Sequence, residues 1–231
     1  MRIAHIGLPK TASTFLQLNY FSKFKGSFFS TKDPFQWPNE LKFVYLLNKE
    51  VEKHYKDWGK HDELLIHNKI IEKKLNYMYI KHKIRAKSFA NSNKSIPRII
   101  LSSEGLYGIN NKVNYLQMKL LKYCSIEKVI FIIRNQSDWL ESFWNQIIVK
   151  EDRFSKYIEA DYIFSSSEES IGYSLNWLDY VKSIINVFGQ ENVLVLPYEM
   201  LVNNPMFFFE RLNQFIGLNP EKQPDFSKKI N

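Results

Sequence analysis

Four short apolar runs, each bounded by turn residues, limit what this chain can fold into. They cover residues 2–6, 98–101, 128–133 and 193–196, and residues 27–30 form a weaker fifth candidate. Runs of this length without alternating polar positions are typical of strands buried on both faces, and such strands belong to parallel sheets. The runs therefore predict the strands of a mainly parallel sheet.

Stretches with helical periodicity separate these predicted strands. They cover residues 14–24, 114–123, 137–150, 171–188 and 205–216. Asn135 or Ser137 can cap the third stretch, Gly189 ends the fourth, and Pro205 opens the last. Strands that alternate with helices predict an α/β fold, in this case a doubly wound sheet of four or five strands flanked by helices.

Residues 36–96 contain no convincing strand, and we expect them to form a helical insertion. We expect residues 1–231 to form a single domain, because a chain of this length buries one sizeable core. A hydrophobic content of 45% argues against a disordered chain.

The insertion contains most of the excess positive charge. Between Lys69 and Lys94 there are eight basic residues and one acid, Glu72, which is +7 of the net charge of +8. Such a stretch can contact anionic surfaces, including nucleic acid, acidic polysaccharide and lipid headgroups, or it can be a solvated helical face. No helix-turn-helix, zinc-finger or RNP pattern accompanies it, so we do not expect specific nucleic-acid binding.

The cysteine count and the N-terminal residues bear on the compartment. A single cysteine, Cys124, excludes an intrachain disulfide framework and leaves too few thiols for a zinc cluster. The sequence starts directly with a predicted strand and contains no run of 18 apolar residues. These features predict a cytoplasmic protein without a metal centre.

The segment HIGLPKTASTFLQ, residues 5–17, leads from the first predicted strand into the first helix. The start of a helix directs several backbone N–H groups at one point, and Lys10 adds a full charge beside the hydroxyls of Thr11, Ser13 and Thr14. These donors predict a site for a phosphate-class anion, although a basic loop without a ligand is the alternative. The ATP/GTP loop requires a glycine directly before its lysine, whereas this chain has Pro9 there.

A second candidate anion site follows the predicted strand at residues 128–133. Arg134 comes directly after that strand, and Ser142 comes eight residues later on the next helix. A guanidinium offers a rigid fork of donors that suits a phosphate. Two anion sites predict a nucleotide that is phosphorylated at both ends. The alternative is that Arg134 pairs with Asp138 at the start of the helix.

Both segments resemble the nucleotide-binding motifs of sulfotransferases. GLPKTASTFLQ resembles their 5′-phosphosulfate loop, RNQSDWLESFW resembles their 3′-phosphate motif, and VLVLPYEMLVNNP is similar to their late strand with its Tyr-Glu-x-Leu segment. The resemblance implies that the donor is 3′-phosphoadenosine 5′-phosphosulfate (PAPS). It also implies two sets of binding residues: Lys10, Thr11, Ala12, Ser13, Thr14 and Phe15 around the 5′ end, and Arg134 and Ser142 around the 3′-phosphate.

Two residues depart from the family pattern. Ala12 replaces the usual glycine of the loop, and Gln136 replaces the usual proline of the second motif. An alanine fits such a loop without strain only if its φ angle is negative.

Sulfuryl transfer also needs a base and stabilisation of the leaving phosphate. By the resemblance, Lys10 suits the second task. Glu104, which follows residues 98–101, is the first candidate for the base, and Asp33 is its rival, although neither residue need serve. We expect His5, which lies within the first strand, to be a packed histidine.

The acceptor is less constrained than the donor. Aromatic residues are frequent in and around the insertion, namely Phe35, Trp37, Tyr45, Tyr55, Trp58, Tyr77 and Tyr79. Aromatic rings stack on sugar faces, so a hydroxyl of a carbohydrate or glycolipid is the predicted acceptor, although these rings could equally form a core. A P-loop kinase and a non-catalytic module that binds a nucleotide or a polyanion are the alternative functions.

Overall fold

The computed structural model describes residues 1–7, 11–24, 27–30, 41, 64–103, 111–145 and 177–217. Its centre is a parallel sheet of five strands in the order β2-β3-β1-β4-β5. The strands are β1 (Arg2–Gly7), β2 (Ser27–Ser30), β3 (Ile99–Ser103), β4 (Lys128–Ile133) and β5 (Val193–Pro197). The predicted α/β fold is confirmed, and the weaker candidate at residues 27–30 is an edge strand of the sheet.

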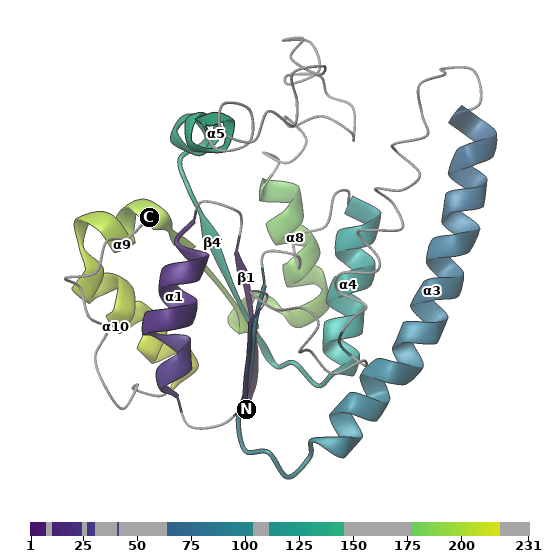
Figure 1. Ribbon diagram of the computed structural model, residues 1–231, viewed down its shortest axis with the longest axis horizontal. Coiled ribbons are helices and arrows are strands. Elements are labelled where there is room, and N and C mark those ends of the chain that lie inside the picture. The colour runs from purple at the N-terminus through teal and green to yellow at the C-terminus, as the bar shows by residue number, and fades with distance from the viewer. Residues whose placement is uncertain are drawn as a thin grey trace.

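Helices connect these strands (Figure 1). They are α1 (Ser13–Asn19), α3 (Leu64–Ser92), α4 (Asn111–Tyr123), α5 (Gln136–Trp144), α8 (Trp177–Phe188), α9 (Tyr198–Asn203) and α10 (Pro205–Ile216). Glycines end two of these helices: Gly189 follows α8 with a φ angle of 84°, and Gly217 follows α10 with a φ angle of 72°. Residues 146–150 and 171–176, which the sequence predicted to be helical, lie outside the described residues.

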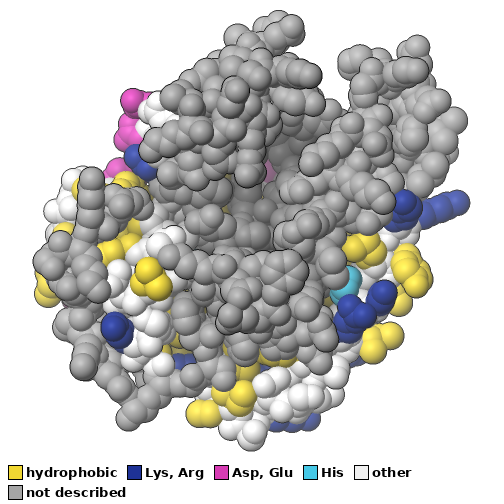
Figure 2. Space-filling model, viewed as in Figure 1, with side chains coloured by type: hydrophobic (Ala, Val, Ile, Leu, Met, Phe, Trp, Pro, Cys, Tyr) yellow, Lys and Arg dark blue, Asp and Glu magenta, His cyan; other side chains and the backbone are white. Residues whose placement is uncertain are grey.

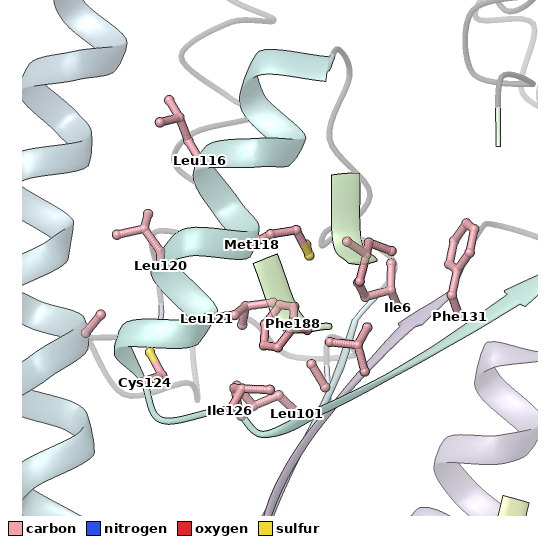
Figure 3. Packing of buried hydrophobic residues seen from close by; sticks show 14 of the residues in the cluster. Ile6, Leu101, Leu116, Met118, Leu120, Leu121, Cys124, Ile126, Phe131 and Phe188 are labelled. Carbon is pink, nitrogen blue, oxygen red and sulfur yellow. The ribbon is translucent and has the colours of Figure 1, made fainter. Parts of the chain in front are cut away.

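Two apolar clusters cover the two faces of the sheet. Ala4 and Ile6 of β1 belong to the cluster that includes α3, α4 and α8, whereas Ile3 belongs to the cluster that includes α1, α9 and α10. Figure 3 shows Met118 and Leu121 of α4 within the first cluster. Because both faces are covered, β1 is buried along its whole length, which explains why its sequence shows no apolar–polar alternation.

The described part of the predicted helical insertion is α3, a helix of 29 residues. It runs along the outside of α4 (Figure 1) and contacts that helix through one side only. Residues 36–63, apart from Leu41, lie outside the described residues. The prediction of helix is therefore confirmed for Leu64–Ser92.

Arg2 ties the first strand to the ends of two helices. Its side chain is buried, with 7% exposed. Nη1 donates to the carbonyl oxygen of Cys124 at 2.8 Å, and Nη2 donates to the carbonyl oxygens of Ala90 at 3.2 Å and Asn93 at 2.9 Å. The last carbonyls of a helix have no partner within it, so one guanidinium satisfies the C-terminal ends of both α3 and α4.

We expect Arg2→Met to lower the free energy of unfolding by about 2–3 kcal/mol, because it leaves buried carbonyls without their charged donor. Urea unfolding followed by circular dichroism measures this loss. Arg211→Met, at an exposed position of α10, is the matched control and should change stability by less than about 0.5 kcal/mol. Equal effects of the two substitutions would show that Arg2 does not join these helices.

Candidate active site

The carboxyl ends of three neighbouring strands bring the predicted site residues to one edge of the sheet. β1 lies between β3 and β4, and its last residues pair with theirs: Ile6 with Ser103 and Gly7 with Ile132. In sheets of this kind ligands bind beyond the carboxyl ends of the strands. The loop after β1 and Arg134 after β4 therefore start side by side at this edge. Lys10 and Glu104 lie outside the described residues.

Gly7 allows the first helix to approach the end of β1 closely. A Cβ atom at Gly7 would lie 2.9 Å from Cβ of Ser13 and closer still to its hydroxyl oxygen. Only glycine leaves room for that contact, since Ser13 is the first residue of α1. Gly7 thus sets the distance between β1 and the start of α1.

Ala12 adopts the backbone conformation that the family glycine would adopt without strain. It is the N-cap of α1, with φ 60° and ψ 22°, in the left-handed region. The condition for an unstrained alanine, a negative φ angle, is therefore not met in this chain. The left-handed conformation costs a residue with a Cβ atom about 1–2 kcal/mol. Ala12 is 2% exposed within the apolar cluster of α1, and burial of its methyl group offsets part of that cost.

The hydroxyls of this loop differ in exposure. Thr11 and Ser13 are buried, as is the ring of Phe15, whereas Thr14 is exposed. Thr14 is therefore accessible to a ligand from solvent, whereas Thr11 and Ser13 are enclosed by protein.

The first residues of the RNQSDWLESFW segment contact α9. Cζ of Arg134 lies 4.7 Å from the ring centroid of Tyr198, and the N–H of Asn135 donates to Oε1 of Glu199 at 2.7 Å. Stacking on the ring face leaves the edges of a guanidinium available for hydrogen bonds. Tyr198 and Glu199 belong to the Tyr-Glu-x-Leu segment, so this segment positions the residues after β4.

Asn135 is the N-cap of α5. Its Oδ1 accepts hydrogen bonds from the N–H groups of Ser137 at 3.0 Å and Asp138 at 3.4 Å, which confirms Asn135 rather than Ser137 as the cap. Ser142 is partly exposed two turns further on. A spacing of seven residues places it on the helix face that carries Asn135.

A buried polar network that the sequence did not predict lies between β1, β3 and α1. Nδ1 of His5 is 2.7 Å from Oγ of Ser102, and Nε2 of Gln17 donates to the same oxygen at 3.0 Å. These residues come from β1, β3 and α1, so the network joins the two strands to the helix. The expectation that His5 is packed is confirmed, since it is fully buried. No pattern in the sequence connects Gln17 with the other two residues.

Burial lowers the pKa of His5 from 6.5 to about 3, so its ring is neutral near pH 7. Its Cε1 would lie 3.4 Å from a Cβ atom at Gly7, which places the ring beside the last residue of β1. A protonated ring there would be a buried charge. The neutral network therefore contributes to the stability of this end of the sheet.

We expect acid to destabilise the protein through His5. Because the folded pKa lies below the unfolded pKa, the unfolded state binds the extra proton between pH 6.5 and about 3. The free energy of unfolding should fall through that window as the pH is lowered, by up to about 1.4 kcal/mol per pH unit for this group. His82, whose pKa burial lowers to about 4, adds to the fall.

Urea unfolding of the wild type and of His5→Gln at pH 7.5, 5.5 and 4.5 separates the two histidines. The difference in stability between pH 7.5 and 4.5 should be smaller in His5→Gln than in the wild type. Parallel pH dependences would show that His5 does not titrate in this way.

The described residues offer neither a metal site nor a membrane span. Within the described ranges, no three residues among histidine, cysteine, aspartate and glutamate gather as metal ligands. No helix in the same ranges is both long and apolar enough to cross a membrane.

Comparison with known proteins identifies the family. A solved sulfotransferase from Alicyclobacillus acidocaldarius aligns with a TM-score of 0.52 and 14% identity over 99% of this chain and 85% of that chain, so the two share a fold. The sulfotransferase domain from the Synechococcus PCC 7002 olefin synthase aligns with a TM-score of 0.48 and 16% identity over 100% of this chain and 84% of that chain.

Among curated proteins, the chain is 23% identical over 249 residues to Protein Ycf2 of Physcomitrium patens. The match includes 93% of this chain but spans only about a tenth of the length of that protein (10%). The family model described as "Sulfotransferase domain" matches residues 3–229, which includes β1, the loop after it, β4 and the start of α5. The protein therefore belongs to the sulfotransferase family.

Proposed function

We propose that this sulfotransferase takes its sulfuryl group from PAPS and transfers it to a hydroxyl of a carbohydrate or glycolipid. The observation that carries the proposal is the strand order β3-β1-β4, which brings the loop after β1 and Arg134 to one edge of the sheet. The family match supports sulfuryl transfer as the chemistry. It also argues against the P-loop kinase.

The loop after β1 and Arg134 bind opposite ends of the PAPS molecule. The segment Lys10, Thr11, Ala12, Ser13, Thr14 and Phe15 binds the 5′-phosphosulfate, with the exposed residue Thr14 as its accessible donor. Arg134, stacked on Tyr198, presents its guanidinium to the 3′-phosphate, and Ser142 adds a hydroxyl. A guanidinium held by an aromatic ring is already oriented, so less conformational entropy is lost when a phosphate binds.

In the reaction the acceptor oxygen attacks sulfur, and the bond between sulfur and the 5′-phosphate oxygen breaks. Adenosine 3′,5′-bisphosphate leaves with the negative charge, which Lys10 stabilises. A carboxylate takes the proton of the acceptor hydroxyl. Glu104 is the favoured base, since it directly follows Ser103 of β3, the strand beside β1. Asp33 follows β2, which lies one strand further from β1.

The acceptor class is supported by aromatic residues around the insertion. Tyr77 and Tyr79 are on α3, with Tyr77 exposed and Tyr79 half-buried. The remaining rings of that set, Phe35, Trp37, Tyr45, Tyr55 and Trp58, lie outside the described residues. Turnover with a panel of oligosaccharides and glycolipids tests the acceptor class. A non-catalytic module would bind the bisphosphate and transfer sulfate to no acceptor.

We expect Arg134→Ala to weaken binding of adenosine 3′,5′-bisphosphate by roughly 1.5–3 kcal/mol, because a charge-assisted contact with the 3′-phosphate is lost. Calorimetric titration with the bisphosphate and with 5′-AMP isolates that contact, since only the first ligand carries a 3′-phosphate. Arg211→Ala, an exposed arginine of α10, is the matched control. Equal losses for both ligands would remove Arg134 from the 3′-phosphate site.

We expect Glu104→Gln to cut turnover by about 100-fold or more with little change in donor affinity, because the amide keeps the size of the carboxyl group but cannot accept a proton. Asp33→Asn, assayed in parallel, should stay near wild type. The reverse result would assign the base to Asp33. Wild-type turnover in both variants would mean that neither carboxylate is the base.

A further inference from the structure

The outer face of α3 exposes large apolar side chains. Tyr77, Ile80 and Ile84 are 68%, 61% and 69% exposed. Their spacing of three and four residues places them in one stripe along the helix, which we call the α3 stripe. The opposite side of α3 packs on the protein core through Leu75, His82, Ala86, Phe89 and Ala90. The stripe is therefore not required to attach α3 to the rest of the molecule.

Basic side chains flank the α3 stripe on both sides. Four lysines of this helix are exposed, and two further basic residues are half-buried; the six are Lys73, Lys74, Lys81, Lys87, Lys83 and Arg85. No acidic residue occurs anywhere between Lys73 and Lys94 in the sequence. Figure 2 shows dark blue and yellow side chains together along the side of the molecule where Figure 1 draws α3.

The lysines on one flank of the stripe contact the last residue of α4. Nζ of Lys83 lies 4.8 Å, and Nζ of Lys87 5.5 Å, from the ring centroid of Tyr123. At 100° per residue, Lys74 and Lys81 lie on the other flank. Positive charge therefore borders the apolar stripe along its length, which at 1.5 Å per residue is about 10 Å.

We propose that the outer face of α3 docks on the surface of a lipid bilayer that contains anionic lipids. The α3 stripe enters the boundary between headgroups and acyl chains, and the flanking lysines contact the phosphate groups. The two sides of α3 therefore have different roles: the buried side attaches the helix to the core, and the outer side offers apolar groups bordered by Lys and Arg to the interface. The proposal does not depend on the identity of the sulfuryl donor or acceptor.

Charge and apolar exposure together favour this partner over others. A nucleic acid or an acidic polysaccharide would neutralise the lysines but would leave Tyr77, Ile80 and Ile84 in water. A second copy of the chain would bring two positive helices together, which is unfavourable. An anionic bilayer offers apolar and negative groups at the same surface, so it satisfies both the α3 stripe and the lysines beside it.

Co-sedimentation of the full chain with vesicles tests this surface. The wild type should bind vesicles of phosphatidylcholine mixed with phosphatidylglycerol at least about tenfold more tightly than vesicles of phosphatidylcholine alone, and added salt should weaken that binding. Ile80→Ser/Ile84→Ser should lower binding by about tenfold or more, because two large side chains no longer enter the apolar layer. Lys81→Glu/Lys87→Glu should lower it by a similar factor.

Matched controls come from α8, where Leu178 is 64% exposed and the side chain of Lys182 is 62% exposed. Leu178→Ser and Lys182→Glu should bind vesicles like the wild type, and circular dichroism should show all variants folded. Failure of the wild type to bind anionic vesicles would overturn the proposal. Loss of binding with the charge variant alone, together with binding to soluble heparin, would instead identify a polyanion site.

Discussion

The hydrogen-bonded pairing of β1 with β3 on one side and β4 on the other is the constraint on which the candidate site depends. The register joins Ile6 to Ser103 and Gly7 to Ile132, so three chain segments leave the sheet at one edge. Helices cover both faces of β1, and water has no access to its backbone. A shift of this register would exchange the side chains that pack on the two faces of β1 and disrupt both apolar clusters, and this cost holds the three segments in place.

The loop after β1 combines close packing with local strain. Gly7 admits Ser13 at a distance that any larger residue would prevent, and Ala12 holds a left-handed backbone conformation. Strain of this kind persists only where the surroundings determine the backbone conformation. The buried network of His5, Ser102 and Gln17 supplies such surroundings, because it joins α1, which Ala12 caps, to β1 and β3.

Among the described residues, three groups of basic side chains lie at separate places. Arg2, at the amino end of β1, joins the C-terminal ends of α3 and α4. Arg134, directly after the carboxyl end of β4, lies against Tyr198. The lysines of α3 form the third group and border the exposed α3 stripe. A guanidinium that satisfies several carbonyls in the interior stabilises the fold, whereas charges beside exposed apolar groups are available to a partner.

Features that depend on neighbouring residues could be predicted from the sequence. All five strands were predicted, and Asn135, Gly189 and Pro205 mark helix ends because caps act within one turn. Helix α9 was not predicted, since its six residues are too few to show a period. Residues 8–10 and 104–110 lie outside the described part, so Lys10 and Glu104 stay predictions.

Features that join distant segments could not be predicted from the sequence and are seen in the folded protein alone. The strand order β2-β3-β1-β4-β5 cannot be derived from the apolar runs, because any parallel order buries them equally well. Gln17 meets Ser102 across 85 residues, and Arg2 reaches Cys124 across 122. The positive φ of Ala12 likewise depends on the packing of α1 against β1. These contacts form only when the whole sheet is assembled, and local propensity carries no information about them.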